Sequence, residues 1–283
     1  MTGYLGSQLE EFSKKNLQNK LFIKFNRKTK KFDTNKPKSI NLIINFSSPN
    51  EIVCRSGTDL NSIFKSWKKT IDIAINSTKI THLINISSIH VFKNRNNLIN
   101  ESSKYGSKDP YAVMQMKCVK YLNEKCLNKK IRLINLFVSN IYGSINKNIK
   151  IRQNLVLNET IISALLNKNL VLKSDCNVTR DFVWIEDFLI ILNKIIEKKD
   201  QIKFKKIIVA SGQTLNVKKI IIILFNYLKK SKKQKIIFGE KITNKLHPIY
   251  YSNLRLLDIL NLENKNNFKS INQTLKKLES IYK

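Results

Sequence analysis

The sequence predicts an α/β fold with a parallel central sheet. Short segments rich in Ile, Leu, Val and Phe alternate with longer segments whose apolar residues recur at helical spacing. This alternation is typical of parallel strands joined by helices. The expected strands are residues 21–25, 40–46, 81–87, 131–138 and 206–210. The expected helices are residues 59–79, 111–127, 158–166, 185–197 and 217–228, followed by two more within 252–283.

The strands are predicted from segments that are short and strongly apolar. Residues 21–25 read LFIKF and residues 40–46 read INLIINF, a composition that favours buried strands. Residues 81–87, 131–138 and 206–210 have the same character, and each is followed by polar residues that mark the end of the strand.

The helices are predicted from the spacing of apolar residues and from end signals. In residues 59–79 the apolar side chains fall on one face, and Pro110 can occupy the first turn of the next helix. Residues 217–228 contain an apolar run flanked by lysines. A membrane span needs roughly 20 apolar residues, so we interpret this run as the buried part of a helix and expect no membrane contact.

The chain is strongly basic, with 52 Lys and Arg against 20 Asp and Glu and a net charge of +32. Such a charge can indicate binding of nucleic acid. The lysines, however, are spread over the whole length together with many Asn and Ile, as AT-rich codons would produce, and no DNA- or RNA-reading motif is present. Nucleic acid is therefore an unlikely partner, whereas a positive field favours a small anionic ligand such as a nucleotide diphosphate.

The four cysteines, at positions 54, 118, 126 and 176, form no C-x-x-C pair and no metal-ligand spacing. We expect reduced thiols in a cytoplasmic protein, and no metal site. The N-terminus has no basic-then-apolar secretory signal.

Two segments place small residues where a ligand could approach the backbone. Thr2-Gly3-Tyr4-Leu5-Gly6 places two glycines at the start of a helical segment, where backbone N–H groups can approach a pyrophosphate. Asn45-Phe46-Ser47-Ser48 ends an expected strand in small residues, which let a ligand run close to the backbone.

Four further segments contain potential reactive or anion-binding side chains. Ile86-Ser87-Ser88-Ile89-His90-Val91-Phe92 follows a strand, and Asp109-Pro110-Tyr111 opens a helix. Residues 136–143 read LFVSNIYG and residues 179–187 read TRDFVWIED.

In this order the segments resemble the extended short-chain dehydrogenase/reductase family, and within it the NAD(P)-dependent epimerases and dehydratases of sugar nucleotides. The resemblance implies a Rossmann-type parallel sheet with a smaller, mixed C-terminal substrate domain. The boundaries it implies are 1–149 for the dinucleotide-binding domain and 150–283 for a mainly substrate-binding domain, with segments near 178–215 returning to the core.

The resemblance also implies the role of each motif residue. Ser88 and Tyr111 align with the catalytic serine and tyrosine. NAD or NADP would lie against Gly3, Tyr4, Leu5, Gly6, Phe46 and Ser47. Asn140 and Arg180 would hold a nucleotide-sugar substrate, with Arg180 on its pyrophosphate because a planar guanidinium matches phosphate oxygens. A homodimer formed through residues 59–79 and 111–127 is a further expectation.

The chain departs from the family pattern at several positions. Gln115 stands where the Y-x-x-x-K lysine would lower the pKa of the tyrosine and hold the nicotinamide ribose. Asn26 and Arg27 occur where NAD enzymes place an acid after the second strand, a change that could suit the 2′-phosphate of NADP. Phe137 and Ser144 replace the arginine and the proline that flank the S-N-x-Y-G segment.

The family's first strand and first glycine are missing before Thr2. The first strand of the sheet is therefore expected to be absent, and the chain is expected to be a truncated or late-starting version of a longer one.

Two functions remain open at this point. The residues after Ser88 are Ile89 and His90, not the acidic residues of dehydratases or decarboxylases, which leaves a 4-epimerase or a 4-keto-reductase. The alternative is a catalytically impaired paralogue that binds a nucleotide or a partner, as the loss of the lysine at Gln115 would allow.

Overall fold

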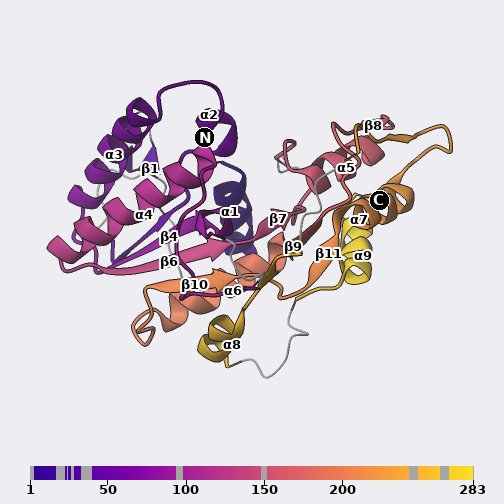
Figure 1. Cartoon of the computed structure of the whole chain (residues 1–283). Helices are drawn as coiled ribbons and strands as arrows, with labels where there is room; N and C mark the ends of the chain where they lie inside the picture. Colours follow the sequence, from indigo (N-terminus) through magenta and orange to yellow (C-terminus); the bar gives the residue numbers. More distant parts are fainter. Residues whose placement is uncertain are drawn as a thin grey trace.

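A four-stranded parallel sheet forms the centre of one half of the molecule (Figure 1). The computed structural model describes residues 3–16, 23, 25–26, 29–32, 40–93, 98–147, 152–241, 248–261 and 268–282. The strand order is β10-β6-β4-β3, and all three pairings are parallel. The strands are β3 (Leu42–Asn45), β4 (His82–Ser88), β6 (Arg132–Val138) and β10 (Lys206–Val209). The predicted α/β fold with a parallel sheet is confirmed.

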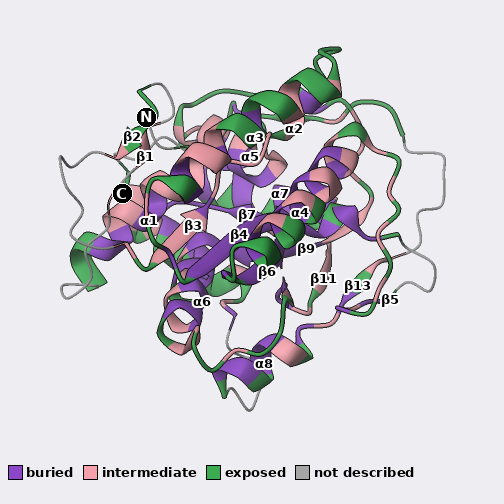
Figure 2. Cartoon of the chain, turned by 90° about the vertical axis from the view of Figure 1, so that its left-hand side faces the viewer, coloured by how far each residue is buried: buried purple, intermediate pink, exposed green. Residues whose placement is uncertain are grey.

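Helices cover both faces of this sheet, so its central strands are buried (Figure 2). On one face, Leu83 and Leu133 pack in one cluster with side chains of α3 (Leu60–Asn76) and α4 (Pro110–Asn128). On the other face, the alternate residues of β4 and β6 pack with α1 (Tyr4–Asn16) and α6 (Ile185–Lys198). Pro110 is the first residue of α4, as predicted, and the Asp109 carboxylate caps the helix by accepting from the N–H groups of Tyr111 and Ala112.

The second half of the molecule is built from shorter strands and three packed helices (Figure 1). Its mixed sheet has the order β11-β9-β7, and two-stranded pairs β12-β8 and β13-β5 lie outside it. The strands are β5 (Leu98–Ile99), β7 (Asn140–Tyr142), β8 (Leu170–Val171), β9 (Thr179–Trp184), β11 (Thr214–Asn216), β12 (Ile236–Ile237) and β13 (Tyr250–Tyr251). The helices are α5 (Val156–Leu165), α7 (Val217–Leu228) and α9 (Ile271–Tyr282). Elsewhere in the described ranges are three shorter helical segments: α2 (Glu51–Cys54) after β3, the 3₁₀ turn η1 (Ile89–Val91) after β4, and α8 (Leu254–Leu260).

The N-terminal segment differs from the expectation of a second strand in the parallel sheet. β1 (Phe25–Asn26) pairs antiparallel with β2 (Lys31–Phe32), so Asn26 lies in a separate hairpin. The predicted strand 21–25 and the predicted site residue Arg27 lie largely or wholly outside the described residues. Within the part of the chain that is described, the parallel sheet ends at β3.

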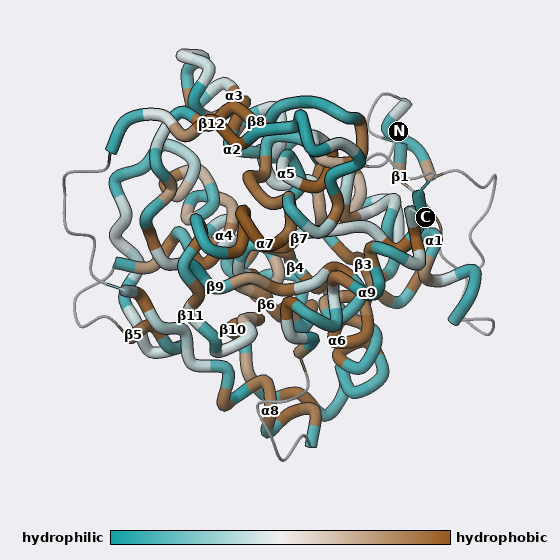
Figure 3. The backbone as a smooth tube through the Cα atoms, turned by 90° about the vertical axis from the view of Figure 1, so that its right-hand side faces the viewer, coloured by the Kyte–Doolittle hydropathy of each residue, from teal (hydrophilic) through white to brown (hydrophobic). Residues whose placement is uncertain are grey.

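Hydrophobic residues gather towards the middle of the molecule and hydrophilic ones around the outside (Figure 3). Among the helices of the described ranges, none combines the length and the apolar composition that crossing a membrane requires. All four cysteines are free thiols, and two of them lie on α4, as predicted.

A row of asparagines crosses the parallel sheet below α4. Asn45, Asn85 and Asn135 are Cα register partners on β3, β4 and β6, and all three are buried. Asn45 Nδ2 donates to Asn85 Oδ1 (2.8 Å), and Asn85 Nδ2 donates to Asn135 Oδ1 (2.9 Å). The Asn135 amide continues the row to Asn123 Oδ1 on α4 (3.3 Å). Each amide both donates and accepts, so the polar groups are satisfied without water.

A partly buried ion pair holds the segment before α9 against the start of α6. Lys269 Nζ lies 2.6 Å from Asp187 Oδ1 and 3.2 Å from Glu186 Oε2. The Lys269 backbone N–H also donates to Asp187 (2.7 Å). The Asp187 side chain is 4% exposed and that of Glu186 is 28% exposed, so Asp187 holds the more protected half of this contact.

Replacing the central asparagine of the row should destabilise the fold strongly. Asn85→Ala leaves an amide donor of Asn45 and a carbonyl acceptor of Asn135 buried without partners, and each such group costs about 1–3 kcal/mol. Urea unfolding should therefore show a loss of about 2–4 kcal/mol. The control Asn76→Ala removes an exposed amide at the end of α3 and should stay within about 0.5 kcal/mol. A loss at position 85 no larger than the control's would show that the row contributes nothing.

The two acids that contact Lys269 should differ in their effects on unfolding. Asp187→Asn leaves a half-buried ammonium without its main counter-charge and should cost roughly 2–4 kcal/mol. Glu186→Gln removes the more exposed contact and should cost less than about 1 kcal/mol. Thermal or urea unfolding of the matched pair measures both values. Equal losses would contradict the assignment of Asp187 as the principal partner.

Candidate functional site

Three predicted site residues, Ser88, Tyr111 and Asn140, lie at or near the carboxyl ends of β4 and β6. Ser88 is the last residue of β4, and its register partner on β6 is Val138, two residues before Asn140. Tyr111 is the second residue of α4, which starts above the same edge of the sheet. Open α/β sheets bind ligands in the crevice outside the carboxyl ends of their strands.

The structure brings Ser88 and Tyr111 together. A side-chain hydrogen bond with Ser88 lowers the pKa of Tyr111, but burial has the larger effect, and the net pKa of Tyr111 is raised. Ser88 is buried, and its Oγ also accepts from the backbone N–H of His90 (3.2 Å). The rings of His90 and Tyr111 meet edge to face, with centroids 6.3 Å apart. A hydroxyl pair of this kind can hold one ligand oxygen and exchange a proton with it.

Both polar atoms of the Gln115 side-chain amide form hydrogen bonds within the protein. Its side chain is 2% exposed; Ser87 Oγ donates to Gln115 Oε1 (3.3 Å), and Gln115 Nε2 donates to the Pro49 carbonyl (2.9 Å). Gln115 therefore ties α4 to β4 and to the segment that follows β3. It brings no charge to Tyr111 one turn away.

Arg180 lies beside His90 and Tyr251. Its positive charge, together with desolvation, lowers the pKa of the His90 imidazole, whereas burial raises the pKa of Tyr251 to about 12 despite the same charge. Arg180 Nη1 donates to the Thr179 carbonyl (3.1 Å). Within the described ranges no carboxylate lies within ion-pair distance of Arg180, which leaves its other donors open to an anionic ligand.

The carboxylate of the next residue, Asp181, is bound by Ser211 and not by Arg180. Its buried carboxylate accepts from Ser211 Oγ (2.7 Å) and from the Ser211 N–H (3.0 Å). Burial raises the pKa of the Asp181 carboxyl, and these hydrogen bonds oppose the rise. The Asp181 carbonyl accepts from Asn140 Nδ2 (2.9 Å), so Asn140 is held next to the strand that carries Arg180.

The start of α1 offers backbone donors to an anion. The N–H groups of Tyr4, Leu5 and Gly6 precede the first helical hydrogen bond, which Ser7 N makes to Gly3 O (2.9 Å). A Cβ added at Gly3 would meet no atom of the described residues within 4 Å, its own chain neighbours apart. The side chains of Tyr4 and Leu5 turn into the main apolar cluster, which leaves only their backbone for a ligand.

The loop after β7 is held close to α1 and β9. The Tyr4 hydroxyl donates to the Gly143 carbonyl (2.6 Å). Gly143 has φ +91°, and a Cβ there would lie 1.9 Å from the Trp184 ring, so glycine is required for this approach.

The end of β3 is partly engaged in the protein. The N–H and Oγ of Ser47 both donate to Asn45 Oδ1 (3.0 and 2.6 Å), and Phe46 packs against the main apolar cluster. Ser48 Oγ, by contrast, is a buried hydroxyl without a partner among the described residues. Asn26, in the separate hairpin, is not part of the sheet edge that carries Ser88. The open first turn of α1 and the orphaned Ser48 hydroxyl fit a dinucleotide at its pyrophosphate and at the end of β3.

Two residues near this site were missed by sequence reasoning. Tyr251 lies beside Arg180, and the charge of Arg152 acts on both Tyr4 and Tyr111. A signal for Arg152 existed, because the chain has only seven arginines among its 52 basic residues. Arginine that persists against such a lysine-rich background indicates a position where the guanidinium itself is needed.

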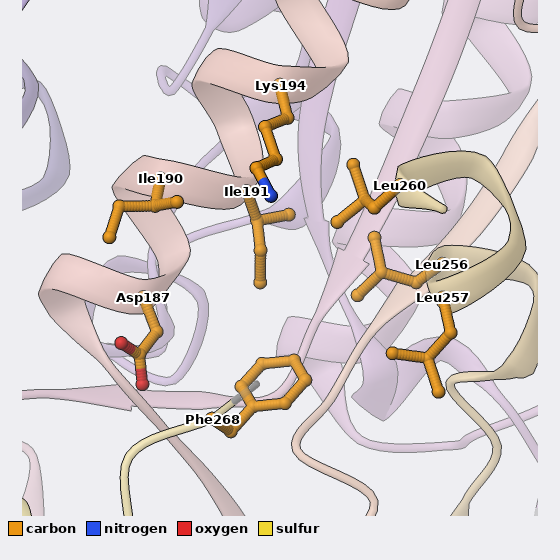
Figure 4. A pocket seen from close by; sticks show the side chains of 8 residues that line it. All are labelled: Asp187, Ile190, Ile191, Lys194, Leu256, Leu257, Leu260 and Phe268. Carbon is orange, nitrogen blue, oxygen red and sulfur yellow. The ribbon is translucent and has the colours of Figure 1, made fainter. Parts of the chain in front are cut away.

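A separate cavity of about 160 Å³ lies between α6 and α8, where mostly apolar side chains face one another (Figure 4). The charged groups in its lining are Asp187, which is held by Lys269, and Lys194. It contains none of the predicted site residues. In the part of the chain that the structure describes, no group of three or more His, Cys, Asp or Glu side chains is placed to hold a metal ion.

Comparisons with known proteins agree with this geometry. The sequence model of the NAD dependent epimerase/dehydratase family matches residues 1–211. A search of curated protein sequences found no match.

Solved structures with the same fold include enzymes named for UDP sugars. RMD from Pseudomonas aeruginosa, complexed with NADPH, is 14% identical, with a TM-score of 0.74 over 99% of this chain and 95% of that one. UDP-glucuronic acid 4-epimerase from Bacillus cereus, in complex with UDP-glucuronic acid and NAD, is 18% identical, with a TM-score of 0.62 over 83% of this chain and 70% of that one. UDP-glucose 4-epimerase from Thermotoga maritima, with UDP-glucose, is 14% identical, with a TM-score of 0.66 over 84% and 76%.

The family model spans three quarters of the chain and includes the glycine turn, the Ser88–Tyr111 pair and Arg180. The family is NAD-dependent, and its solved relatives contain NAD or NADPH, in agreement with the cofactors predicted from the sequence. The chain therefore belongs to the NAD dependent epimerase/dehydratase family.

Proposed function

We propose that this protein is an NAD(P)-dependent sugar-nucleotide 4-epimerase or 4-keto-reductase. The observation that carries the proposal is the Ser88–Tyr111 pair at the carboxyl edge of the sheet. The guanidinium of Arg180 is nearby and has no carboxylate partner among the described residues. A hydroxyl pair supplies proton transfer, and a free guanidinium supplies binding of phosphate. These are the two tasks that a sugar nucleotide requires from the protein.

Tyr111 exchanges a proton with the sugar. As a phenolate it accepts the proton of the reacting hydroxyl, and as a phenol it returns that proton when the carbonyl is reduced. Ser88 hydrogen-bonds the same sugar oxygen and orients it towards Tyr111. A nicotinamide cofactor held at the start of α1 and the end of β3 would supply the hydride transfer.

The substrate pyrophosphate is assigned to Arg180 and the cofactor pyrophosphate to the start of α1. Arg180 has guanidinium donors without a carboxylate partner in the described part of the chain, and Asn140 is positioned on the adjacent strand β7. The free N–H groups at the start of α1, next to Gly3, favour a negatively charged group. Ser48 Oγ supplies a hydroxyl partner at the end of β3.

The residues next to Ser88 favour epimerisation or keto reduction over elimination of water. Ile89 is buried and His90 is neutral at pH 7, since its pKa is lowered by desolvation and by Arg180. Elimination of water needs an acid and a base beyond the tyrosine, and this position supplies no carboxylate. Epimerisation or keto reduction needs only the Ser88–Tyr111 pair and the cofactor.

A second candidate function is favoured by Gln115. A protein that keeps the fold and binds a sugar nucleotide without turnover would tolerate a neutral residue engaged by Ser87 and Pro49. The two candidates share substrate binding by Arg180 and differ in catalysis by Tyr111.

Substitutions at Tyr111 and Arg180 separate these two candidates. With NADH or NADPH fluorescence as the readout of cofactor binding and UDP-hexose conversion as the readout of turnover, Tyr111→Phe should lower kcat by at least about 100-fold and leave binding intact. Arg180→Gln should raise KM about tenfold or more through lost charged hydrogen bonds, and Arg180→Lys should restore part of the loss. Binding of a UDP-hexose that depends on Arg180, in a protein with no measurable turnover, would establish the impaired paralogue. Failure to bind either cofactor would overturn the enzyme and leave only the impaired paralogue.

The pH dependence of turnover should show the missing charge at position 115. Because burial raises the pKa of Tyr111, the phenolate is scarce at neutral pH, and kcat/KM should rise with pH into the alkaline range. Gln115→Lys can donate to Ser87 and to the Pro49 carbonyl while adding a charge, so it should move this rise to lower pH. Gln115→Met, which has a similar size and no charge, is the control and should not move it down. Coincident profiles for wild type and Gln115→Lys would contradict the assignment of Tyr111 as the base.

A further inference from the structure

The loop of residues 143–146, which follows β7, is held against α1 by a buried glutamine. Gln8 Nε2 donates to Ser144 Oγ (2.9 Å), and Gln8 Oε1 accepts from the Ile145 N–H (3.0 Å). Gln8 and Ser144 are fully buried, so water does not compete for these hydrogen bonds. The position of the loop is therefore set by α1 as well as by the strand β7.

Tyr4 makes a second contact with the same loop, one turn earlier on α1. Its hydroxyl donates to the Gly143 carbonyl (2.6 Å), and the Gly143 N–H donates to Asn158 Oδ1 on α5 (2.8 Å). Burial raises the pKa of Tyr4, so the hydroxyl keeps the proton that it donates. Gly143 is thus held between two helices, with its backbone against the Trp184 ring.

Tyr4 belongs to both halves of the candidate site. Its backbone N–H is one of the donors that precede the first helical hydrogen bond of α1, where the cofactor pyrophosphate is assigned. Its hydroxyl holds Gly143, three residues after Asn140, which is assigned to the substrate. A change in the order or position of the first turn of α1 is therefore transmitted to the end of β7.

From this arrangement we propose that Tyr4 is a positioning residue that makes binding of the sugar nucleotide depend on the bound cofactor. The inference rests on the proposed function, because that function places the two ligands at the start of α1 and at Asn140. Without a cofactor, the first turn of α1 has unsatisfied N–H groups and opens easily, and the loop loses its support. A pyrophosphate bound there orders the turn, and the Tyr4 hydroxyl then holds the loop in the position that binds substrate. Coupling of this kind is reciprocal between the two ligands.

The test measures the dissociation constant of UDP-glucose by calorimetry, with and without saturating reduced cofactor (NADH or NADPH, whichever binds more tightly). The ratio of the two constants is the coupling factor, and the reduced cofactor cannot oxidise the sugar, so only binding is observed. The wild-type protein should bind UDP-glucose at least about fivefold more tightly with the cofactor present. Tyr4→Phe, which removes one hydroxyl, should lower the coupling factor by about threefold or more.

Tyr142→Phe is the matched control, because it removes a buried tyrosine hydroxyl from the residue next to Gly143. This hydroxyl contacts Thr274 Oγ1 on α9 (3.0 Å) and not α1. Tyr142→Phe should lower the free energy of unfolding but leave the coupling factor within about twofold of wild type. A merely structural role of Tyr4 would make the two variants alike. Gln8→Met, which removes the contacts of the glutamine amide at similar size, should lower the coupling factor as Tyr4→Phe does.

Hydrogen exchange separates this inference from the proposed function, because it needs the cofactor alone. The N–H groups of Gly143 and Ile145 are bonded to side chains, so their exchange reports how firmly the loop is held. The cofactor should slow their exchange several-fold in the wild type and much less in Tyr4→Phe. This result in a protein that does not bind UDP-glucose would uphold the role of Tyr4 and reject the proposed substrate. A coupling factor that is the same in wild type and Tyr4→Phe, in a protein that converts UDP-hexose, would overturn the inference and leave the proposed function standing.

Discussion

The row of buried amides through Asn45, Asn85 and Asn135 determines how the strands of the parallel sheet are aligned. Each asparagine sits opposite the next in register, with hydrogen bonds of 2.8 and 2.9 Å. A slip of one residue would turn the amides to the opposite, apolar face and leave them without partners. The row therefore permits one alignment, in which the carboxyl ends of the three strands lie level and bring Ser88 and the segments after β3 and β6 to one edge.

The hydrogen-bonding side chains on the face of the sheet towards α4 explain how Gln115 can occupy the position of a lysine. One step further along the strands from the asparagines, Ser87 donates to Gln115, which in turn donates to the Pro49 carbonyl. A glutamine satisfies both contacts with neutral groups and extends the amide network into α4. The gain is a buried side chain with a hydrogen bond at each of its two polar atoms, and the loss is the positive charge of a lysine beside Tyr111.

Most of the helices and motif residues that could be predicted from the sequence depend on local sequence patterns. The bounds of α7 coincide with the predicted residues 217–228, because the apolar run and its flanking lysines are local features. Ser88 and Tyr111 could be paired because each belongs to a recognisable segment. The asparagine row could not be predicted, since its members are separated by 40 and 50 residues and meet only through strand order. Asn26 was misplaced because a hairpin with residues 31–32 competes with the expected strand.

Arg152 and Arg180 also show why a net charge of +32 says little about the chemistry of the site. Surface lysines are solvated, and salt screens their charges beyond roughly 10 Å. Together they make the electrostatic potential around the protein more positive, but they do not act on one particular side chain. Arg152 and Arg180 are half-buried, reach the site from segments outside the parallel sheet, and have no carboxylate partners in the described part of the chain. Their effect depends on the fold that places them, whereas the forty-five lysines contribute to the net charge without marking a site.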